Sequence, residues 1–328
     1  MSFALFTDSS ANLPQHVLEQ CGIQVVSLTY RVGDREYPCY APNEPFDSET
    51  FYASMKDPSF TPRTSLVNGE TFRAAFAPVL EGGQDILYIG MSSGISGTLQ
   101  SAAIAREALM KEYPRRTVRI VDTLGASLGE GLMVCHGAAL RESGAELEDA
   151  AQAIEALVPS MCQRFLVDDL MYLKRGGRVS GAAAVIGTLI NIKPIMKGVS
   201  GKIELDCKVM GRQKALRTLA DYFAAHAIQP ETQTVGIAHA ASQRDALSLR
   251  DMILERRKVK EFLIVPYEPG TGAHVGPGTV ALFFLGQDAG NEANPLLASV
   301  KKRIESIDTT KLRSAIRDRF RKHVEPRE

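Results

Sequence analysis

The chain has 328 residues, and its 38 Lys and Arg residues balance its 38 Asp and Glu residues, so the formal net charge at pH 7 is +0. A molecule without net charge has no overall attraction to polyanions, and we expect no nucleic-acid partner. Its five cysteines are widely separated, odd in number and form no Cys-x-x-Cys pair, which argues against a disulfide framework and a metal site. The start lacks a signal-peptide pattern and no apolar run reaches about 18 residues, so we expect a cytoplasmic protein with reduced thiols.

The first apolar run, residues 3–6, predicts a buried strand that ends in polar residues. Ligands of doubly wound folds bind at the carboxyl edge of the parallel sheet, so Asp8 and Ser9 are candidate site residues. The alternative is a local role, in which Ser9 or Asn12 caps the next helix and Asp8 serves the loop.

A second predicted strand, residues 24–30, leads into a proline-rich excursion over residues 38–62. The excursion is long for a connection, and long ordered loops tend to be functional. It ends at Thr64 and Ser65, just before a helix predicted over about residues 68–80. Their hydroxyls could either cap that helix or face a ligand.

Residues 86–89 predict another buried strand, and from Thr98 onward the composition favours a helix. A loop of glycines and serines joins the two, which is a plausible seat for an anion because the backbone N–H groups at a helix start carry partial positive charge. Ser92, Ser93 and Ser96 would add hydroxyl donors. The alternative is that Ser96 or Thr98 merely caps the helix.

The alternation of strands and helices through residue 160 indicates an α/β fold with a doubly wound parallel sheet. We therefore predict an N-terminal α/β domain over residues 1–160 and a second, mixed α/β domain over residues 161–287. The remaining residues, 288–328, are basic and show helical spacing, which predicts a helical extension packed on the body. The elements expected beyond residue 110 are strands at 117–122, 192–199, 202–209, 234–238, 262–266 and 279–285, and helices at 127–141, 182–189, 213–227 and 244–256.

A glycine-rich segment, residues 270–278, is expected to be a loop before the last strand. It is a poor dinucleotide fingerprint, because that motif needs a helix N-terminus for the pyrophosphate. His274 within it is the better candidate, as a polar contact in a cleft.

Two chemistries are compatible with the serine loop. Gly90-Met-Ser-Ser-Gly94 matches the G-x-S-x-G pattern of a nucleophile elbow, with Ser92 as nucleophile and Asp122 and then His239 or His274 following in hydrolase order. An elbow needs its helix directly after the serine, however, and the segment Gly94-Ile-Ser-Gly97 intervenes here before the helix that begins at Thr98. The second chemistry is binding without catalysis.

In the binding interpretation, Thr64, Ser65, Ser93, Ser96 and His274 converge as donors on a carboxylate or a phosphate. The loop contains no Lys or Arg, which favours a single carboxylate over a multiply charged phosphate.

The chain resembles the DegV family, whose characterised members are the fatty-acid-binding (FakB-type) subunits of bacterial fatty acid kinase. The resemblance extends from about residue 3 to residue 286 and depends on an ordered set of motifs. These are Thr7-Asp8-Ser9-Ser10-Ala11-Asn12-Leu13, Pro62-Arg63-Thr64-Ser65, Ser92-Ser93-Gly94-Ile95-Ser96-Gly97-Thr98, Val121-Asp122-Thr123, Leu173-Lys174-Arg175-Gly176-Gly177-Arg178-Val179-Ser180, Asn191-Ile192-Lys193-Pro194-Ile195, and the segment from His274 to Gly278.

The resemblance implies two domains that clasp one long-chain fatty acid, with the acyl chain in a tunnel and the carboxylate near the domain cleft. It assigns the carboxylate contacts to Thr64, Ser93 and His274, with Ser65 and Ser96 as neighbours. The carrier would be non-catalytic, without metal or cofactor. It would present its acid to a separate ATP-dependent fatty acid kinase for phospholipid synthesis. Transient contact with a membrane is compatible with this role.

Arg175 and Arg178 are candidates for docking that kinase, although a helix-capping and surface role is equally open. The chain departs from the usual family pattern at Leu66 and Val67, where Gln-Pro is common, and at Met210, where Arg is common.

Overall fold

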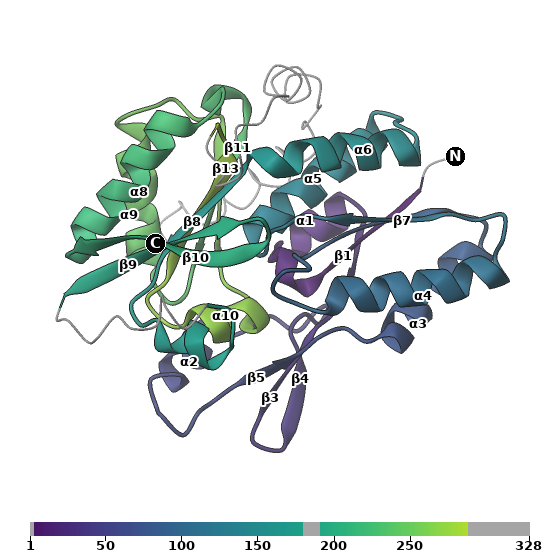
Figure 1. Cartoon of the computed structure of the whole chain (residues 1–328), viewed down its shortest axis with the longest axis horizontal. Coiled ribbons are helices and arrows are strands. Elements are labelled where there is room, and N and C mark those ends of the chain that lie inside the picture. The colour runs from purple at the N-terminus through teal and green to yellow at the C-terminus, as the bar shows by residue number, and fades with distance from the viewer. Residues whose placement is uncertain (1–2, 180–190, 288–328) are drawn as a thin grey trace, which may run out of the picture.

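The computed structural model describes residues 3–179 and 191–287 (Figure 1). The first sheet is parallel and covered by helices on both faces. Its strands, in order across the sheet, are β2 (Ile23–Val26), β1 (Ala4–Asp8), β6 (Ile86–Gly90) and β7 (Val118–Asp122). Its helices are α1 (Gln15–Gln20), α3 (Gly69–Glu81), α4 (Thr98–Glu112), α5 (Leu128–Glu142) and α6 (Leu147–Leu157). The doubly wound parallel sheet predicted from the alternation of elements is confirmed.

The two faces of this sheet follow from the period of two along each strand. In β1, Ala4 and Phe6 belong to one apolar cluster, with α3 and α4. Leu5 lies on the opposite face and belongs to a larger cluster that contains α5 and α6.

The second sheet is mixed, as predicted, and its strand order is β10 (Lys202–Met210), β9 (Ile192–Val199), β8 (Met161–Leu166), β13 (Val280–Leu285), β11 (Thr234–His239) and β12 (Glu261–Pro266). Only the β11–β12 pair is parallel among its described neighbours. Helices α8 (Arg212–His226) and α9 (Gln243–Leu254) cover its outer face. In the described ranges there are also short 3-10 helices at Ser9–Ala11, Val158–Ser160 and Pro230–Thr232.

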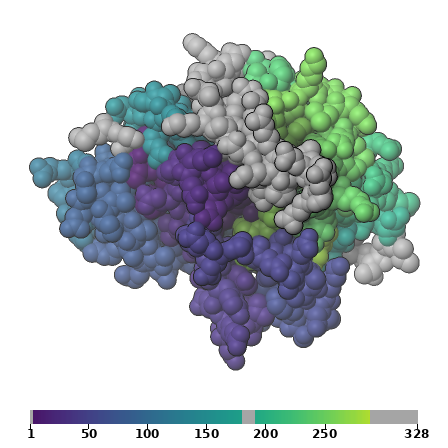
Figure 2. Space-filling model, turned by 180° about the vertical axis from the view of Figure 1, so that it is seen from behind, coloured from purple at the N-terminus to yellow at the C-terminus, as the bar shows by residue number. Residues whose placement is uncertain are grey.

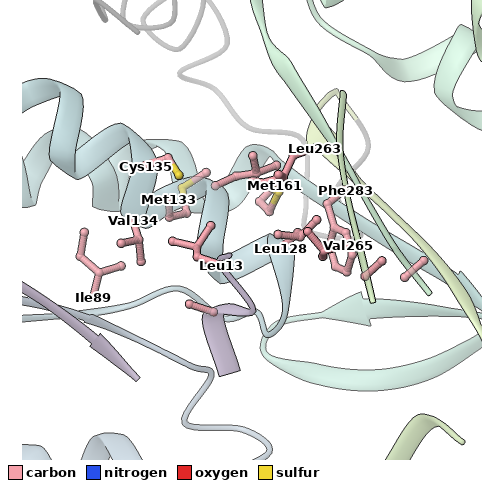
Figure 3. Packing of buried hydrophobic residues seen from close by; sticks show 14 of the residues in the cluster. Leu13, Ile89, Leu128, Met133, Val134, Cys135, Met161, Leu263, Val265 and Phe283 are labelled. Carbon is pink, nitrogen blue, oxygen red and sulfur yellow. The ribbon is translucent and has the colours of Figure 1, made fainter. Parts of the chain in front are cut away.

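Helix α5 lies between the two sheets and joins their cores. Figure 3 shows Ile89 of the first sheet and Met161 and Phe283 of the second on either side of α5 residues. All belong to one cluster of buried apolar side chains. The inner face of the second sheet is therefore closed by the first half of the chain, and a cavity between them must be lined by both.

The segment after β2 differs from the prediction of one strand over residues 24–30. The chain leaves the first sheet at Ser27 and enters a separate antiparallel sheet of β4 (Arg35–Pro38), β3 (Thr29–Val32) and β5 (Arg63–Ser65). The Ser27 hydroxyl accepts a hydrogen bond from the Tyr40 backbone and donates to the Leu28 carbonyl, which stabilises this change of direction. The excursion also contains α2 (Ser48–Ser54), and this arm projects at the bottom of Figure 2.

One alternative that the sequence left open and one local prediction are wrong. Neither Thr64 nor Ser65 caps α3, because Asn68 does so by accepting a hydrogen bond from the Thr71 backbone at 2.9 Å. The glycine-rich segment is not a plain loop, since it contains α10 (Pro269–Val275). The helix predicted at 182–189 and the extension at 288–328 lie outside the described residues. Within 3–179 and 191–287, no helix is long and apolar enough to cross a bilayer.

Candidate binding cavity

A mostly apolar cavity lies between the inner face of the second sheet, the serine loop, β5 and α10. Its lining comes from both halves of the chain, as the shared core requires. The lining residues are Leu28, Thr64, Ser65, Leu66, Met91, Ile95, Ser96, Gly97, Leu124, Gly125, Ala126, Ser127, Gln163, Phe165, Leu173, Arg178, Gly198, Gly201, Lys202, Ile203, Tyr267, Gly270, Thr271, His274, Val275 and Phe283.

Polar side chains gather at the end of the cavity formed by β5 and α10, which we call the polar end. Thr64 Oγ1 and His274 Nε2 lie 2.8 Å apart and share a hydrogen bond, although 210 residues separate them. Burial and, to a smaller extent, the nearby positive charge of Arg178 together lower the pKa of His274 to about 4. His274 is therefore a neutral imidazole at pH 7, able to donate from one nitrogen and accept at the other.

In the Lys-Arg-Gly-Gly-Arg segment, Gly176 and Gly177 are each required to be glycine, for two different structural reasons. Gly176 ends α7 (Met171–Arg175) with ordinary helical φ, but a Cβ there would overlap His274 Nδ1. Gly177 has φ +70° and open space around it. The first glycine lets the backbone approach the imidazole, and the second turns the chain.

Arg178 lies at the polar end, where it is half-buried and lines the cavity. Burial lowers the pKa of its guanidinium below the usual value. It donates to the Gly176 carbonyl, so its position is tied to the turn that follows α7. The serine loop lacks a cation, but the folded cavity supplies one from another segment, and a guanidinium is a strong partner for a carboxylate.

Helix α10, which carries His274, is fixed in place by contacts with the first half of the chain. Glu268 caps it, accepting hydrogen bonds from the backbone and hydroxyl of Thr271 at 2.6 and 2.5 Å. The Glu268 backbone donates to Asn12 at 2.9 Å, and the hydroxyl of Tyr52 donates to the Tyr267 carbonyl at 2.9 Å. Burial raises the pKa of Glu268 to about 7.

The serines of the loop point in different directions. Ser96 lines the cavity, and its Oγ lies 2.9 Å from Thr98 Oγ1. Ser93 is exposed, is not part of the lining, and donates to Asp122 at 2.5 Å. Of the expected carboxylate contacts, the structure brings Thr64, Ser65, Ser96 and His274 to one cavity and leaves the Ser93 hydroxyl outside it.

Ser92 does not have the surroundings of a nucleophile. Its hydroxyl is fully buried, donates to the Gly201 carbonyl at 2.7 Å and accepts from the Gly94 backbone at 3.0 Å. Asp122 accepts the hydrogen bond of Ser93 instead, His274 is paired with Thr64, and His239 Nδ1 accepts from the Ser242 backbone at 3.4 Å. The described residues therefore provide no base for Ser92, and this contact instead holds the tip of the β9–β10 hairpin on the serine loop.

Asp8 and Ser9 hold residues of the cavity wall without reaching the cavity. Asp8 is buried and accepts hydrogen bonds from the Tyr88 hydroxyl at 2.7 Å and the Met91 backbone at 3.1 Å. The two strands it links, β1 and β6, flank the point where the strand order of the parallel sheet reverses. Ser9 Oγ accepts from the Leu28 backbone at 3.0 Å. Burial raises the pKa of the Asp8 carboxyl.

Two parts of the cavity wall were not predicted from the sequence: the loop before α5, and the Gln163 side chain, which forms hydrogen bonds with that loop. Leu124 and Ser127 both have positive φ, at 49° and 54°, and both line the cavity. Such backbone strain in residues other than glycine is concentrated at functional sites. Gln163 of β8 also lines the cavity, and it is the polar exception among alternating apolar residues, a signal that is visible in the sequence.

Arg175, the other predicted docking residue, is exposed on α7 and its guanidinium lies 4.7 Å from the centre of the Tyr172 ring. It stands close in sequence to the Gly176 and Arg178 of the polar end. In the described ranges, His, Cys, Asp and Glu side chains form no group of three or more that could hold a metal ion.

Comparison with known proteins gives the same family across the described part of the chain. The profile described as uncharacterised protein, DegV family, matches residues 2–287. A DegV domain-containing protein of Clostridium perfringens is 37% identical over 285 residues, which cover 87% of this chain and 97% of the relative.

Two solved structures are similar in sequence and fold. A DegV family protein from Thermus thermophilus, described as binding fatty acid, is 31% identical with a TM-score of 0.79, covering 87% of this chain and 100% of that one. DegV of Bacillus subtilis, described as a fatty acid binding protein, is 27% identical with a TM-score of 0.73, covering 86% and 98%. By the matched profile and the identity of these relatives, the chain belongs to the DegV family.

Proposed function

We propose that this protein is a non-catalytic carrier that binds one long-chain fatty acid in the cavity. The observation that carries the proposal is a mostly apolar cavity with a polar end, where Thr64 and His274 share a hydrogen bond near Arg178 and where Ser96 belongs to the same lining. An amphipathic acid matches such a cavity. The fatty acid binding described for the relatives from Thermus thermophilus and Bacillus subtilis supports this choice.

The acyl chain and the carboxylate would have different energetic roles. About fourteen methylenes at roughly 0.8 kcal/mol each contribute at most about 11 kcal/mol, whereas each hydrogen bond to a carboxylate contributes about 1.5–3 kcal/mol. The chain therefore supplies most of the affinity. The polar end supplies orientation, so its loss should affect presentation of the acid more than retention of the lipid.

We further propose that the carboxylate is presented to a separate ATP-dependent fatty acid kinase. Leu66, which lines the cavity beside Thr64 and Ser65, is 47% exposed, so the wall of the polar end reaches the surface. Arg175 is exposed on the neighbouring α7 and is the docking candidate. Cys39 and Cys135 are buried free thiols, which fits a reducing compartment such as the cytoplasm, where ATP is available.

The first test is native mass spectrometry of the purified protein, followed by organic extraction and identification of the bound molecule. We expect a long-chain fatty acid in near-stoichiometric amount. A different amphipathic carboxylate or a phosphate would redirect the proposal to another ligand. A protein that is empty and takes up neither oleate nor palmitate would refute it.

The kinase role has its own test. We expect acyl-phosphate to form when the loaded protein is mixed with a bacterial fatty acid kinase and ATP. Arg175→Ala should raise the kinase's KM for the carrier roughly tenfold, because exposed interface charges mainly affect association. Arg115→Ala, an exposed arginine before β7, is the matched control and should change nothing. Equal KM values for the two variants would exclude Arg175 from docking.

A further inference from the structure

A second cavity, which we call the arm groove, lies between the start of α1, the arm that carries β3 and β4, and the end of β12. Its volume is about 680 Å³, which is within the range of binding clefts. Aromatic side chains of the arm line it, and two of them, Tyr30 and Tyr37, are stacked with their ring centres 5.3 Å apart. Tyr37 is 38% exposed, so this aromatic wall can be reached from solvent.

The charged residues of the arm groove are acidic. Glu19 of α1 and Glu44 before α2 are exposed members of the lining, and Asp47 and Glu268 add carboxyl groups that cap α2 and α10. Among the residues that the structure describes, none of this lining is Lys or Arg. A concave surface lined by carboxylates favours a cationic partner, and tyrosine rings attract Lys and Arg through their faces.

The chain itself contains a segment with the matching chemistry. After Asn294 it has ten Lys and Arg against five Asp and Glu, and its apolar residues recur with helical spacing. The segment lies outside the described residues, but the point at which the chain leads into it is defined. Strand β13 ends at Leu285, and the Gln287 backbone donates to the His226 carbonyl at 3.0 Å.

The segment is long enough to reach the arm groove. Pro266, which lines the groove, pairs with His239, and His239 pairs with Val280, at the opposite end of β13 from Leu285. The chain must therefore return along the sheet by about 17 Å, at roughly 3.3 Å per residue. Fully extended, residues 288–294 cover about 23 Å. The basic part of the segment thus begins where it can enter the groove.

We propose that residues 295–328 dock in the arm groove, with their Lys and Arg side chains paired to Glu19 and Glu44 and an apolar face against the aromatic wall. The inference is independent of the proposed function, because it depends on the groove and not on the ligand of the cavity. Tyr267 lines both the arm groove and the cavity, so the docked segment lies against a wall that the two share.

The first test uses the full-length protein and a carbodiimide, which joins a carboxylate to a lysine amine in contact with it without adding a spacer. Unlabelled and ¹⁵N-labelled protein are mixed beforehand, so that peptide mass spectrometry separates links within one chain from links between chains. We expect links within one chain from the lysines of residues 295–328 to Glu19 or Glu44. Links of these lysines only to other carboxylates, links only between chains, or no links at all would overturn the proposal.

The second test measures how fast trypsin releases the segment from the folded, full-length protein. We expect several-fold faster release from Glu19→Gln/Glu44→Gln, which leaves the caps of α2 and α10 intact, because each exposed ion pair contributes only modestly. Glu81→Gln/Glu107→Gln is the matched control and should behave as wild type, since these exposed carboxylates lie on α3 and α4, at the other face of the parallel sheet from α1. Equal release rates for the two double variants would show that the segment does not pair with the groove.

Discussion

The contact between Gly176 and His274 offers a test in which a single methyl group perturbs the polar end. Gly176 has φ −72° and ψ −12°, so alanine there is free of backbone strain, but its Cβ would overlap the imidazole. We expect Gly176→Ala to displace His274 from Thr64. Gly177→Ala is the matched control. A Cβ at Gly177 would meet no neighbouring atom, and this variant differs from Gly176→Ala in that its backbone has the left-handed φ of +70°.

The magnitudes separate the two variants. Losing the hydrogen bond of His274 to a bound carboxylate costs about 1.5–3 kcal/mol, so Gly176→Ala should weaken fatty acid binding about 10- to 100-fold. Gly177→Ala should lower the free energy of unfolding by about 1–2 kcal/mol because of its left-handed backbone, and it should leave the affinity unchanged.

Two measurements decide the case: calorimetric titration with a fatty acid, and NMR titration of the His274 imidazole in the ligand-free protein. Burial holds the pKa of His274 at about 4, and a displaced, more hydrated ring should move back toward 6.5 in Gly176→Ala. A Gly176→Ala variant that keeps both the low pKa and wild-type affinity would refute the reasoning.

Three further outcomes are expected. Ser96→Ala should weaken fatty acid binding several-fold whereas Ser93→Ala should not, as measured by the same calorimetry, because only Ser96 lines the cavity. Arg178→Met should raise the pKa of His274 and weaken fatty acid binding about tenfold. An unchanged pKa of His274 in the NMR titration would contradict the electrostatic effect of Arg178 on the imidazole. Glu268 has a folded pKa of about 7 against a usual 4.5, so its contribution to stability is complete below pH 4.5 and is lost as the pH rises to 7. The unfolding free energy of Glu268→Gln relative to wild type should therefore increase by about 3 kcal/mol between about pH 5 and pH 8 in denaturant titrations.

The parallel sheet was predictable because its strands are mostly apolar and alternate with helical segments along the chain. The split between β2 and β3 was not, because residues 23–32 favour extended backbone along their length and the partner of β3 lies far away in sequence, at β5. Local preference identifies a strand without identifying its sheet. Helix α10 was not predicted, for a different reason. Pro269, Gly270 and Gly272 have low helix propensity, and the Glu268 cap and tertiary packing stabilise the helix in spite of it.

The site was predictable in part. Thr64 and His274 were candidates from their residue types and positions and again from the family resemblance, and the structure places them in one hydrogen bond. Residue type could not separate Ser93 from Ser96, because both are loop serines and only the backbone path decides which one faces the cavity. Arg178 was named for docking, and its place in the lining depends on how the turn after α7 folds back on α10.

The low pKa of His274 bears on what the proposed carrier does with its ligand. A carboxylate that must attack a phosphoryl group needs its negative charge, and a fully charged imidazolium beside Arg178 would neutralise it twice. Burial keeps His274 neutral at pH 7, so it contributes a hydrogen bond and a fixed direction without a second positive charge. Because the acyl chain supplies most of the affinity, the polar end needs no second cation, and a head group that is oriented by His274 and paired with one cation rather than two is the form that a kinase acting in trans would require.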